Sequence, residues 1–533
     1  METLQTIISI MEPYLWMASI DLKDAYFHVP VAREYRRYLR FLIDGRCLQY
    51  TVTPFGLSPA PMLFTSILAV LIVWLRLRRV RLHAYLDDIL IIGNSPRETL
   101  DALRLTIQVL TWAGFILNVK KSDLTPSQDL VFIGGRFVTP LGMVFLPEDR
   151  CAALIRVAHS FSWGALVQAR LWLQLLGFMA AAISTVKFAR LRMRPIQWYL
   201  KTHWKASKDS LDTPVMVRRE VMTSLSWWTR SENLTQGMPF QWPPQEVTVT
   251  TDASMEGWGG HTTIQGRDLL FSGLWSPRER QAHINLLELR AIRLTLLQLT
   301  QSVKSKSVLL ECDNTSAVCY VNKQGGTKSW SLCLEARLLY DWAIQHQVTL
   351  RAIHRPGVDN VLADYLSRSR PDPLEWSLSK RVCEDLFSQW GRPQIDLFAS
   401  QQNHRLPLWY SRLPCPEALG SDAFTHSWTG LHVYAFPPTN LLLRTIIKFR
   451  EDQVEEAILV APNWPRKPWY ELLLPMACEQ PISLRQELGL LSQKLAKGTL
   501  FHPDLRTQNL AAWRLSGKRG KPQGFPRKLL PRL

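Results

Sequence analysis

Asp87 and Asp88 are adjacent carboxylates between two apolar segments, in the sequence His-Ala-Tyr-Leu-Asp-Asp-Ile-Leu-Ile-Ile. Apolar runs on both sides of a short polar pair are typical of a strand, a turn and a second strand. Two acids in a tight turn repel each other, and bound cations neutralise that repulsion. The tetrapeptide Tyr85-Leu86-Asp87-Asp88 is consistent with a metal-dependent phosphoryl-transfer site and equally with a solvated hairpin turn.

Asp21 ends another apolar run, 66 positions before Asp87. A strand ending at Asp21 would bring its carboxylate beside Asp87 on a neighbouring strand. Two such groups can hold two divalent cations about 4 Å apart, one activating a primer hydroxyl and one stabilising the leaving pyrophosphate. Between these acids lies the turn Pro54-Phe55-Gly56-Leu57, with glycine where a backbone must approach a ligand closely. Tyr26 and Phe55, taken alone, would be core aromatic residues.

These segments resemble, in order and spacing, the palm of reverse transcriptases. The resemblance extends to Gly114–Ser122 and to Phe132-Ile133-Gly134-Gly135, which matches the primer grip of that family. It implies that Asp21 and Asp87 are the principal metal ligands and that Asp88 supports them. It also implies that Tyr26 excludes a ribose 2′-hydroxyl, and that Phe55 and Gly56 lie under the incoming nucleotide.

Four acids in the second half of the chain form another ordered set. Each follows a strand pattern or lies in a helical one: Asp252, Glu288, Asp313 and Asp364. One such acid alone would normally be a surface residue. The full set, with Gly257-Trp258-Gly259-Gly260 after the first strand, resembles the RNase H domains joined to reverse transcriptases.

The RNase H resemblance implies that these four acids bind two Mg²⁺ or Mn²⁺ ions. The ions would orient a water for attack on an RNA phosphodiester and stabilise the departing 3′-oxygen. His354 would be the mobile histidine of the family, which assists product release or proton transfer. The alternative for His354 is a loop residue bonded to the Asp359-Asn360 turn. Asn314 would contact the RNA 2′-hydroxyl.

Residues 380–480 contain three apolar strand patterns that end in polar or proline residues, which predicts a small α/β unit. Palm, RNase H and this unit in succession resemble the polyprotein of DIRS-type retrotransposons, truncated at both ends. The corresponding segment of that family is methyltransferase-like. Here Phe436-Pro437-Pro438 matches an amino-methyltransferase loop only loosely, and no glycine-rich loop follows the first strand, so we expect a degenerate or structural domain.

The surrounding patterns predict the elements that position these residues. Helices are expected over 61–75, 97–113 and 283–300, and strands over 247–251 and 307–312. The predicted fold is multidomain, α/β and α+β. We expect an antiparallel palm with helices over 1–150 and a helical thumb or connection over 151–245. Within the second of these, residues 206–245 are expected to be a connector. An RNase H-like α/β domain follows over 246–370, then a small α/β domain over 371–490 and a basic tail over 491–533.

Composition limits the partners. A formal net charge of +18 over 533 residues favours a polyanion, because Lys and Arg displace counterions from phosphate backbones. Eight cysteines without a Cys-x-x-Cys pair indicate neither a zinc module nor a disulfide framework, and a reducing compartment fits them. We expect an intracellular protein, cytoplasmic or nuclear and not secreted. The longest apolar run, Ile67 to Leu75, is too short to cross a bilayer, so no membrane contact is expected.

The sequence therefore predicts a retrotransposon-derived enzyme that cleaves the RNA of RNA–DNA hybrids. RNA-directed DNA polymerisation, with primer–template and dNTPs as ligands, is the second activity of the family. Only twenty residues without Lys or Arg precede Asp21, so we expect an incomplete fingers region and doubt this second activity. The alternatives are a non-catalytic nucleic-acid-binding relic and a methyltransferase within 380–470. The oligomeric state is not predicted.

Overall fold

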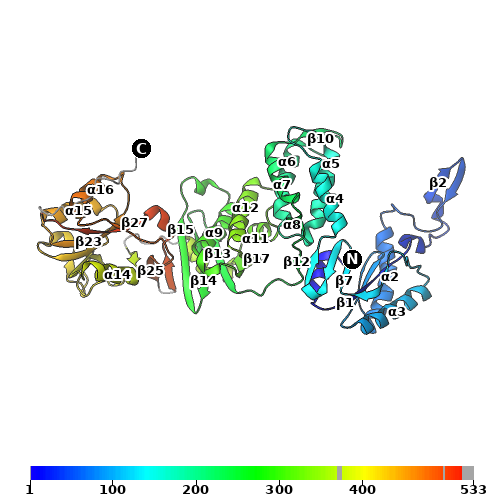
Figure 1. Ribbon diagram of the computed structural model, residues 1–533, viewed down its shortest axis with the longest axis horizontal. Helices are drawn as coiled ribbons and strands as arrows, with labels where there is room; N and C mark the ends of the chain where they lie inside the picture. Colours follow the sequence, from blue (N-terminus) through cyan, green and yellow to red (C-terminus); the bar gives the residue numbers. More distant parts are fainter. Residues whose placement is uncertain (1, 369–374, 496–497, 519–533) are drawn as a thin grey trace. The chain divides into compact units, whose positions relative to one another are not determined.

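The computed structural model describes residues 2–368, 375–495 and 498–518, in two compact units (Figure 1). The first unit comprises Met1–Pro243 with Gly326–Trp330. The second comprises Pro244–Gly325 with Ser331–Leu533. The predicted multidomain α/β and α+β class agrees with this architecture.

The first unit begins with a four-stranded antiparallel sheet in the order β4-β5-β1-β6. Alternation along its central strands buries both faces: Ile89 and Ile91 face helices α2 and α3, whereas Leu90 and Ile92 pack with helix α1 and strand β7. The expected helices over 61–75 and 97–113 are confirmed. The elements are α1 (Leu4–Ile10), β1 (Trp16–Asp21), α2 (Ala60–Leu77), β4 (Arg81–Tyr85), β5 (Asp88–Gly93), α3 (Pro96–Trp112) and β6 (Asp123–Ser127).

A separate antiparallel hairpin lies between β1 and α2. It consists of β2 (Arg40–Ile43) and β3 (Arg46–Gln49), turning at Asp44 and Gly45, both of which have positive φ. The only sheet contact of these two strands is with each other.

Helix α2 is the one helix in the described part of the chain that is long and apolar enough to span a bilayer. The expectation of no such segment rested on its longest uninterrupted apolar run, and the helix extends that run in both directions. Its stripe Phe64, Leu68, Ile72 and Leu75 is buried in the core of the first sheet. Only 28% of this apolar window is buried.

A second small sheet, β12-β9-β8-β7, leads into a group of helices with their own core. We expected a connector over 206–245, and this was wrong for much of it. Val221, Leu225 and Trp228 recur at helical spacing and are buried in that core. The elements are β7 (Asp129–Phe132), β8 (Gly135–Val138), β9 (Met143–Phe145), α4 (Glu148–His159), β10 (Leu166–Gln168), α5 (Ala169–Ala181), α6 (Ala189–His203), β11 (Pro214–Met216), α7 (Arg219–Trp228), α8 (Ser231–Leu234) and β12 (Met238–Pro239).

The second unit begins with five strands in the order β17-β16-β13-β14-β15. The strand expected over 307–312 is confirmed, and the helix over 283–300 is present but ends at Gln298. Helices α9, α11 and α12 cover one face of the sheet, and helix α13 covers the other. The elements are β13 (Val247–Ala253), β14 (Gly257–Ile264), β15 (Arg267–Leu274), α9 (Ile284–Gln298), α10 (Thr300–Val303), β16 (Ser307–Cys312), α11 (Thr315–Asn322), α12 (Trp330–Gln345), β17 (Thr349–His354) and α13 (Val361–Arg368).

Glycines in β14 allow helices to approach both faces of this sheet. A Cβ on Gly259 would lie 2.5 Å from the carbonyl oxygen of Ala363 in α13. A Cβ on Gly260 would meet the side chain of Thr295 in α9. The glycine-rich segment is therefore a packing surface for the two helices that carry Glu288 and Asp364.

The same sheet continues with two strands from near the end of the chain, β26 and β25, and then with the short strand β18. The predicted boundary of a basic tail at 491 was therefore wrong up to Leu515, because Leu491, Leu500 and Trp513 are buried in sheets. Net positive charge hid short apolar strands in this segment. The strands are β18 (Ser377–Leu378), β25 (Leu491–Leu495), β26 (Gly498–Phe501) and β27 (Leu510–Leu515), the last in the other sheet.

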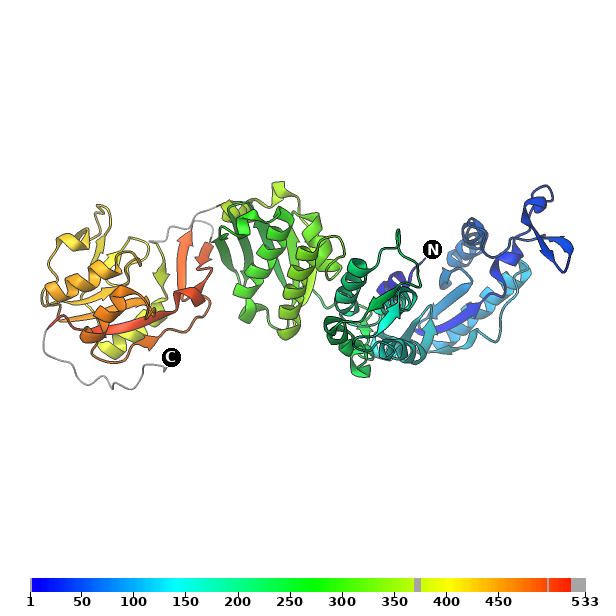
Figure 2. The ribbon, with the colours of Figure 1, turned by 90° about the horizontal axis from the view of Figure 1, so that it is seen from above.

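A seven-stranded sheet, β21-β20-β19-β22-β23-β27-β24, forms the remainder of the second unit. Only β27 runs antiparallel to its neighbours. Helices α15 and α16 pack on one face and α14 on the other (Figure 2). The elements are α14 (Lys380–Trp390), β19 (Ile395–Ala399), β20 (Trp409–Ser411), β21 (Gly420–Ser421), β22 (His432–Ala435), α15 (Leu442–Glu451), β23 (Glu456–Pro462), α16 (Pro468–Leu473), β24 (Ile482–Ser483) and α17 (Leu505–Gln508).

Candidate active sites

Three acids lie together at one end of the first sheet. Asp21 is directly opposite Asp88 in the antiparallel pairing of β1 with β5. Tyr85 pairs with Asp88, so Leu86 and Asp87 form a two-residue turn, and Leu86 has φ 55°. The N–H of Leu22 donates to the carbonyl oxygen of Asp87 over 2.9 Å, which fixes the turn beside β1. The register of these strands therefore places Asp21, Asp87 and Asp88 close together, as the sequence predicted.

The electrostatics of this end suit a cation. Burial, followed by the charges of Asp87 and Asp21, raises the pKa of Asp88 to about 6. A divalent ion would favour the ionised form and relieve this repulsion. Carboxylate oxygens are also the ligands that Mg²⁺ prefers, so the three residues fit such an ion.

Backbone contacts hold Asp21 in place. Its N–H donates to Ser122 Oγ over 3.0 Å, and its carbonyl oxygen accepts the N–H of Asn118 over 2.8 Å. Ser122 Oγ in turn donates to the carbonyl oxygen of Asn118. Asn118 and Ser122, which the sequence marked as a later palm motif, therefore act on the position of Asp21.

The predicted nucleotide-binding residues come together beside these acids. The rings of Tyr26 and Phe55 are 5.0 Å apart between centroids, and Phe55 remains 58% exposed. Burial, with the nearby charge of Asp87, raises the pKa of the Tyr26 hydroxyl. Gly56 has φ 91°, a conformation that side chains rarely adopt. Tyr26, Phe55 and Gly56 thus line one surface next to Asp87.

The predicted primer grip is the tip of the β7–β8 hairpin. Ile133 and Gly134 form its turn, both with positive φ. A Cβ on Gly134 would collide with the guanidinium of Arg150 in α4. Arg150 was not singled out from the sequence, because only the fold places α4 beside this turn.

The second set of acids comes from four separate elements of the other unit. Asp252 is near the end of β13, and Asp313 directly follows the parallel neighbour β16. Glu288 lies on α9 and Asp364 in the first turn of α13, on opposite faces of the sheet. Asp252 interacts electrostatically with Asp313 and Asp364, and Glu288 with Asp252 and Asp313. The fold therefore brings all four predicted residues to one location.

Two of these carboxyls are almost fully buried: Asp252 is 4% exposed and Glu288 is 3% exposed. Burial, with the neighbouring acids, raises the pKa of Asp252 to about 6 and that of Glu288 to about 9. One oxygen of each, Asp252 Oδ2 and Glu288 Oε2, has no hydrogen-bond donor. Buried acceptors without a donor are rare and mark the place of an ion or water. The residues present therefore fit divalent cations.

Cys312 is a neighbour that the sequence reading missed. Its Sγ and the carboxylate oxygens of Glu288 and Asp313 all lie within 4.8 Å of one another. Burial raises the pKa of the Cys312 thiol, so it stays protonated at neutral pH and is a poor ligand. The donors that remain are oxygens, which favours Mg²⁺ or Mn²⁺ over zinc.

His354 ends β17 directly beside Cys312 in the parallel pairing with β16. One ring nitrogen, Nε2, is 3.1 Å from the carbonyl oxygen of Asp313. The Asp359 turn is instead held by Arg355, whose Nε donates to the carbonyl oxygen of Asp359. The alternative interpretation of His354, as the residue that bonds this turn, was therefore wrong. Asn314 caps α11 and donates to Asn285 Oδ1 on α9 over 2.9 Å.

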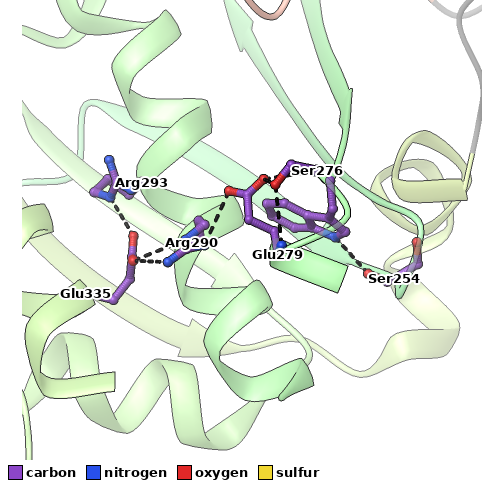
Figure 3. A network of polar contacts seen from close by, with 7 residues as sticks. Ser254, Ser276, Glu279, Arg290, Arg293 and Glu335 are labelled. Atoms are coloured by element: carbon purple, nitrogen blue, oxygen red, sulfur yellow. Dashed lines mark hydrogen bonds and ion pairs between the residues drawn. The ribbon is translucent and has the colours of Figure 1, made fainter. Parts of the chain in front are cut away.

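A polar network holds the back of α9 (Figure 3). Glu335 of α12 is buried and accepts from Arg290 over 3.1 Å and from Arg293 over 2.5 Å. Arg290 also donates to Glu279, which accepts from Ser276. At about 100° per residue, Arg290 is roughly 200° around the helix from Glu288. The network therefore fixes the side of α9 that faces away from the acids.

The comparisons with known proteins support the first of these sites. Residues 2–137 match the family "Reverse transcriptase (RNA-dependent DNA polymerase)". This segment is therefore similar to reverse transcriptase domains. It includes Asp21, Asp87 and Asp88, together with the nucleotide-binding candidates.

Viral polyproteins are similar to a longer part of the chain. The enzymatic polyprotein of Figwort mosaic virus is 22% identical over 387 residues, covering 68% of this chain and 52% of the relative. That of Cauliflower mosaic virus is 26% identical over 374 residues, covering 66% and 50%. The Gag-Pro-Pol polyprotein of Human T-cell leukemia virus 2 is 32% identical over 127 residues, 22% of this chain and 9% of the relative. The chain spans about half the length of the plant-virus relatives.

Solved structures of the foamy viral protease-reverse transcriptase also match. The complex with RNA/DNA hybrid is 16% identical with a TM-score of 0.41, covering 71% of this chain and 49% of that chain. The complex of the dRH form with double-stranded DNA is 15% identical with a TM-score of 0.41, covering 70% and 60%.

The segment assigned to a methyltransferase alternative has no comparable cluster among its described residues. Asp396, the second residue of β19, is buried. Its two oxygens accept the backbone N–H groups of Phe398 and Arg405, over 3.3 and 3.0 Å. This carboxyl therefore holds the loop that follows its own strand.

Proposed function

We propose that this chain is a retroelement reverse transcriptase whose second unit hydrolyses the RNA strand of RNA–DNA hybrids. The observation that carries the proposal is the convergence of Asp252, Glu288, Asp313 and Asp364 from four elements, with buried carboxylate oxygens that lack donors. Repelling acids in a dry site destabilise a fold unless cations neutralise them, so such a cluster indicates a function.

The four carboxylates would hold two Mg²⁺ or Mn²⁺ ions. When bound, these ions supply an activated water and stabilise the departing 3′-oxygen. The chain's own groups prepare the site for them. Glu288 and Asp252 would lose their protons on binding the cations, because the ionised carboxylates would then have a positive partner. Asn314, hydrogen-bonded to Asn285 beside Glu288, presents an amide to the RNA 2′-hydroxyl. His354, beside Asp313, can carry a proton at the same edge.

The reverse transcriptase domain supports a second proposed activity, RNA-directed DNA polymerisation. Asp21 and Asp87 would be the metal ligands, Asp88 a supporting acid, and Tyr26, Phe55 and Gly56 the surface for a dNTP opposite primer–template. The close neighbourhood of these residues supports this assignment. Three parts follow one another along the chain: the palm, the unit that carries Asp252, Glu288, Asp313 and Asp364 (the four-acid unit), and the seven-stranded sheet with helices on both faces. This succession supports a DIRS-type origin.

The decisive experiment uses the full chain with Mg²⁺ and a labelled RNA–DNA hybrid. Asp252→Asn should lower cleavage at least about 100-fold, as for loss of a ligand and its supporting contacts. Asp341→Asn is a matched control, because Asp341 is a half-exposed surface acid of α12. Equal, metal-independent cleavage by wild type and Asp252→Asn would refute the nuclease assignment. No cleavage by any form, with hybrid binding retained, would favour the non-catalytic relic.

Primer extension on an RNA template tests the polymerase site separately. Asp87→Asn should abolish extension while leaving hybrid cleavage unchanged, since the two clusters lie in different units. Extension that survives Asp87→Asn would remove the assigned site.

A further inference from the structure

The end of the chain completes the sheet on which the four acids are assembled. Strand β26 pairs in parallel with β15, through Leu269 with Thr499, Leu270 with Leu500 and Phe271 with Phe501. Strand β25 then pairs with β26 and with β18. We infer that the β25–β26 hairpin is a positioning element for Asp364, an inference that rests on the proposed nuclease function.

The contact that carries this inference lies under α13. Leu366 of α13, Leu270 of β15 and Leu500 of β26 form one cluster and are 0%, 1% and 2% exposed. Trp376, directly before β18, and Leu495, at the end of β25, pack against the same cluster. Leu366 is two residues from Asp364, so the helix that carries this acid rests partly on a strand 136 positions later.

Helix α13 depends on such support because it is only eight residues long. A helix of this length is not stable alone, and tertiary packing must supply its stability. Its other supports are on the neighbouring strands. Asn360 Nδ2 donates to the carbonyl oxygen of Thr251 over 3.1 Å, and Ser272 Oγ donates to that of Leu366 over 2.8 Å. Without the Leu500 side chain, Leu366 would lose one of the buried residues on which the helix packs.

The hairpin fits closely against this edge, and the residues directly after it contact α9, the other helix that carries an acid. Gly498 has φ 149°, and a Cβ there would lie 3.1 Å from the backbone oxygen of Asp268 in β15. Phe501 stacks on Phe271 with centroids 5.9 Å apart, on the α9 face of the sheet. Gln298, the last residue of α9, donates to the carbonyl oxygen of Pro503. The functional unit therefore extends past 370, the predicted end of the RNase H-like domain, and includes 491–495 and 498–503.

The test compares Leu500→Ala with Leu473→Ala in the full chain. Leu473 is an equally buried leucine, but it lies in the core of the seven-stranded sheet. Leu500→Ala should accelerate hydrogen exchange of the amides of 361–368 about tenfold. It should also raise the Mn²⁺ concentration for half-saturation about tenfold, the low end for residues behind a metal ligand. Excess Mg²⁺ should restore hybrid cleavage to the variant. Leu473→Ala should leave exchange in α13 and Mn²⁺ binding unchanged.

Leu500→Val, which removes one carbon, should shift both quantities in the same direction by less, and it serves if the alanine variant does not fold. The inference is overturned if either variant accelerates exchange only in β25 and β26 while α13 and Mn²⁺ binding match wild type. If wild type cleaves no hybrid and binds no Mn²⁺, the proposed nuclease fails. The exchange of α13 still decides whether the hairpin holds that helix.

Discussion

The buried carboxyl of Glu288 should make the metal-free protein less stable as pH rises, and Glu288→Gln should remove this dependence. The pKa of Glu288 is raised to about 9 in the fold, mainly by burial, from an ordinary value of 4.5. The folded state therefore keeps a proton that the unfolded chain loses. The stabilisation from this proton is fully present below about pH 4.5 and is lost as pH rises toward about 9.

The magnitude follows from the linkage relation. Each pH unit inside this window costs about 1.4 kcal/mol, so the change from about pH 5 to about pH 8 is at most about 4 kcal/mol. Asp252 and Asp313 share the repulsion, so part of this amount belongs to the cluster. Glutamine has the shape of the protonated acid and no charge to desolvate. Glu288→Gln should equal wild type near pH 5 and exceed it near pH 8.

The assay is native-state hydrogen exchange of the amides of α9 and β13 in EDTA. The rates are corrected for intrinsic exchange at each pH. Hydrogen exchange is chosen because it reports the local stability of this site within a chain of several domains. Saturating Mg²⁺ should reduce the advantage of the glutamine variant, since the cation stabilises ionised Glu288. Hybrid cleavage by Glu288→Gln should be lost throughout. Equal pH dependence in both proteins without metal would refute the argument that Glu288 is protonated in the empty site.

Three further predictions concern the supports of the two sites. Glu335→Ala leaves Arg290 and Arg293 without their shared carboxylate and should destabilise the α9–α12 pair by about 3–5 kcal/mol; unchanged thermal unfolding and unchanged exchange in both helices would contradict the role of the network. Gly259→Ala would press a methyl against α13 and should cost about 1–3 kcal/mol, with weaker Mn²⁺ binding by calorimetry, whereas Mn²⁺ binding like wild type would show that the helix can shift freely. Leu86→Gly should stabilise the palm by about 1 kcal/mol, because glycine adopts φ 55° without strain; Leu86→Ala keeps the strain and should show no such gain in exchange protection of β4 and β5.

The acids were predictable because their signals are local. An apolar run that ends in Asp21, Asp252 or Asp313 identifies both a strand and the residue at its end. The tight turn at Leu86 and Asp87 follows from two strands separated by two residues. Cys312, Arg150 and Glu335 carry no local signal, since each acts through a neighbour that is distant in sequence. A polar composition likewise concealed α7 within the expected connector, where only the burial of Trp228 against other helices shows its place.

The sequence by itself identified the candidate residues: two sets of carboxylates, their strands and helices, and the resemblance of the first set to a polymerase palm. Only the tertiary structure decided that the four-acid unit does not end near residue 370. Strand pairing depends on which sheet edges are exposed and on packing between residues far apart in the sequence. A short stretch of sequence contains neither kind of information. The free edge of β15 accepts β26 because Gly498 permits close approach and Leu500 fills the space beneath Leu366. The acids are therefore recognisable in the sequence, whereas the residues that we infer to position Asp364 lie far from it in the sequence and are identified only by the fold.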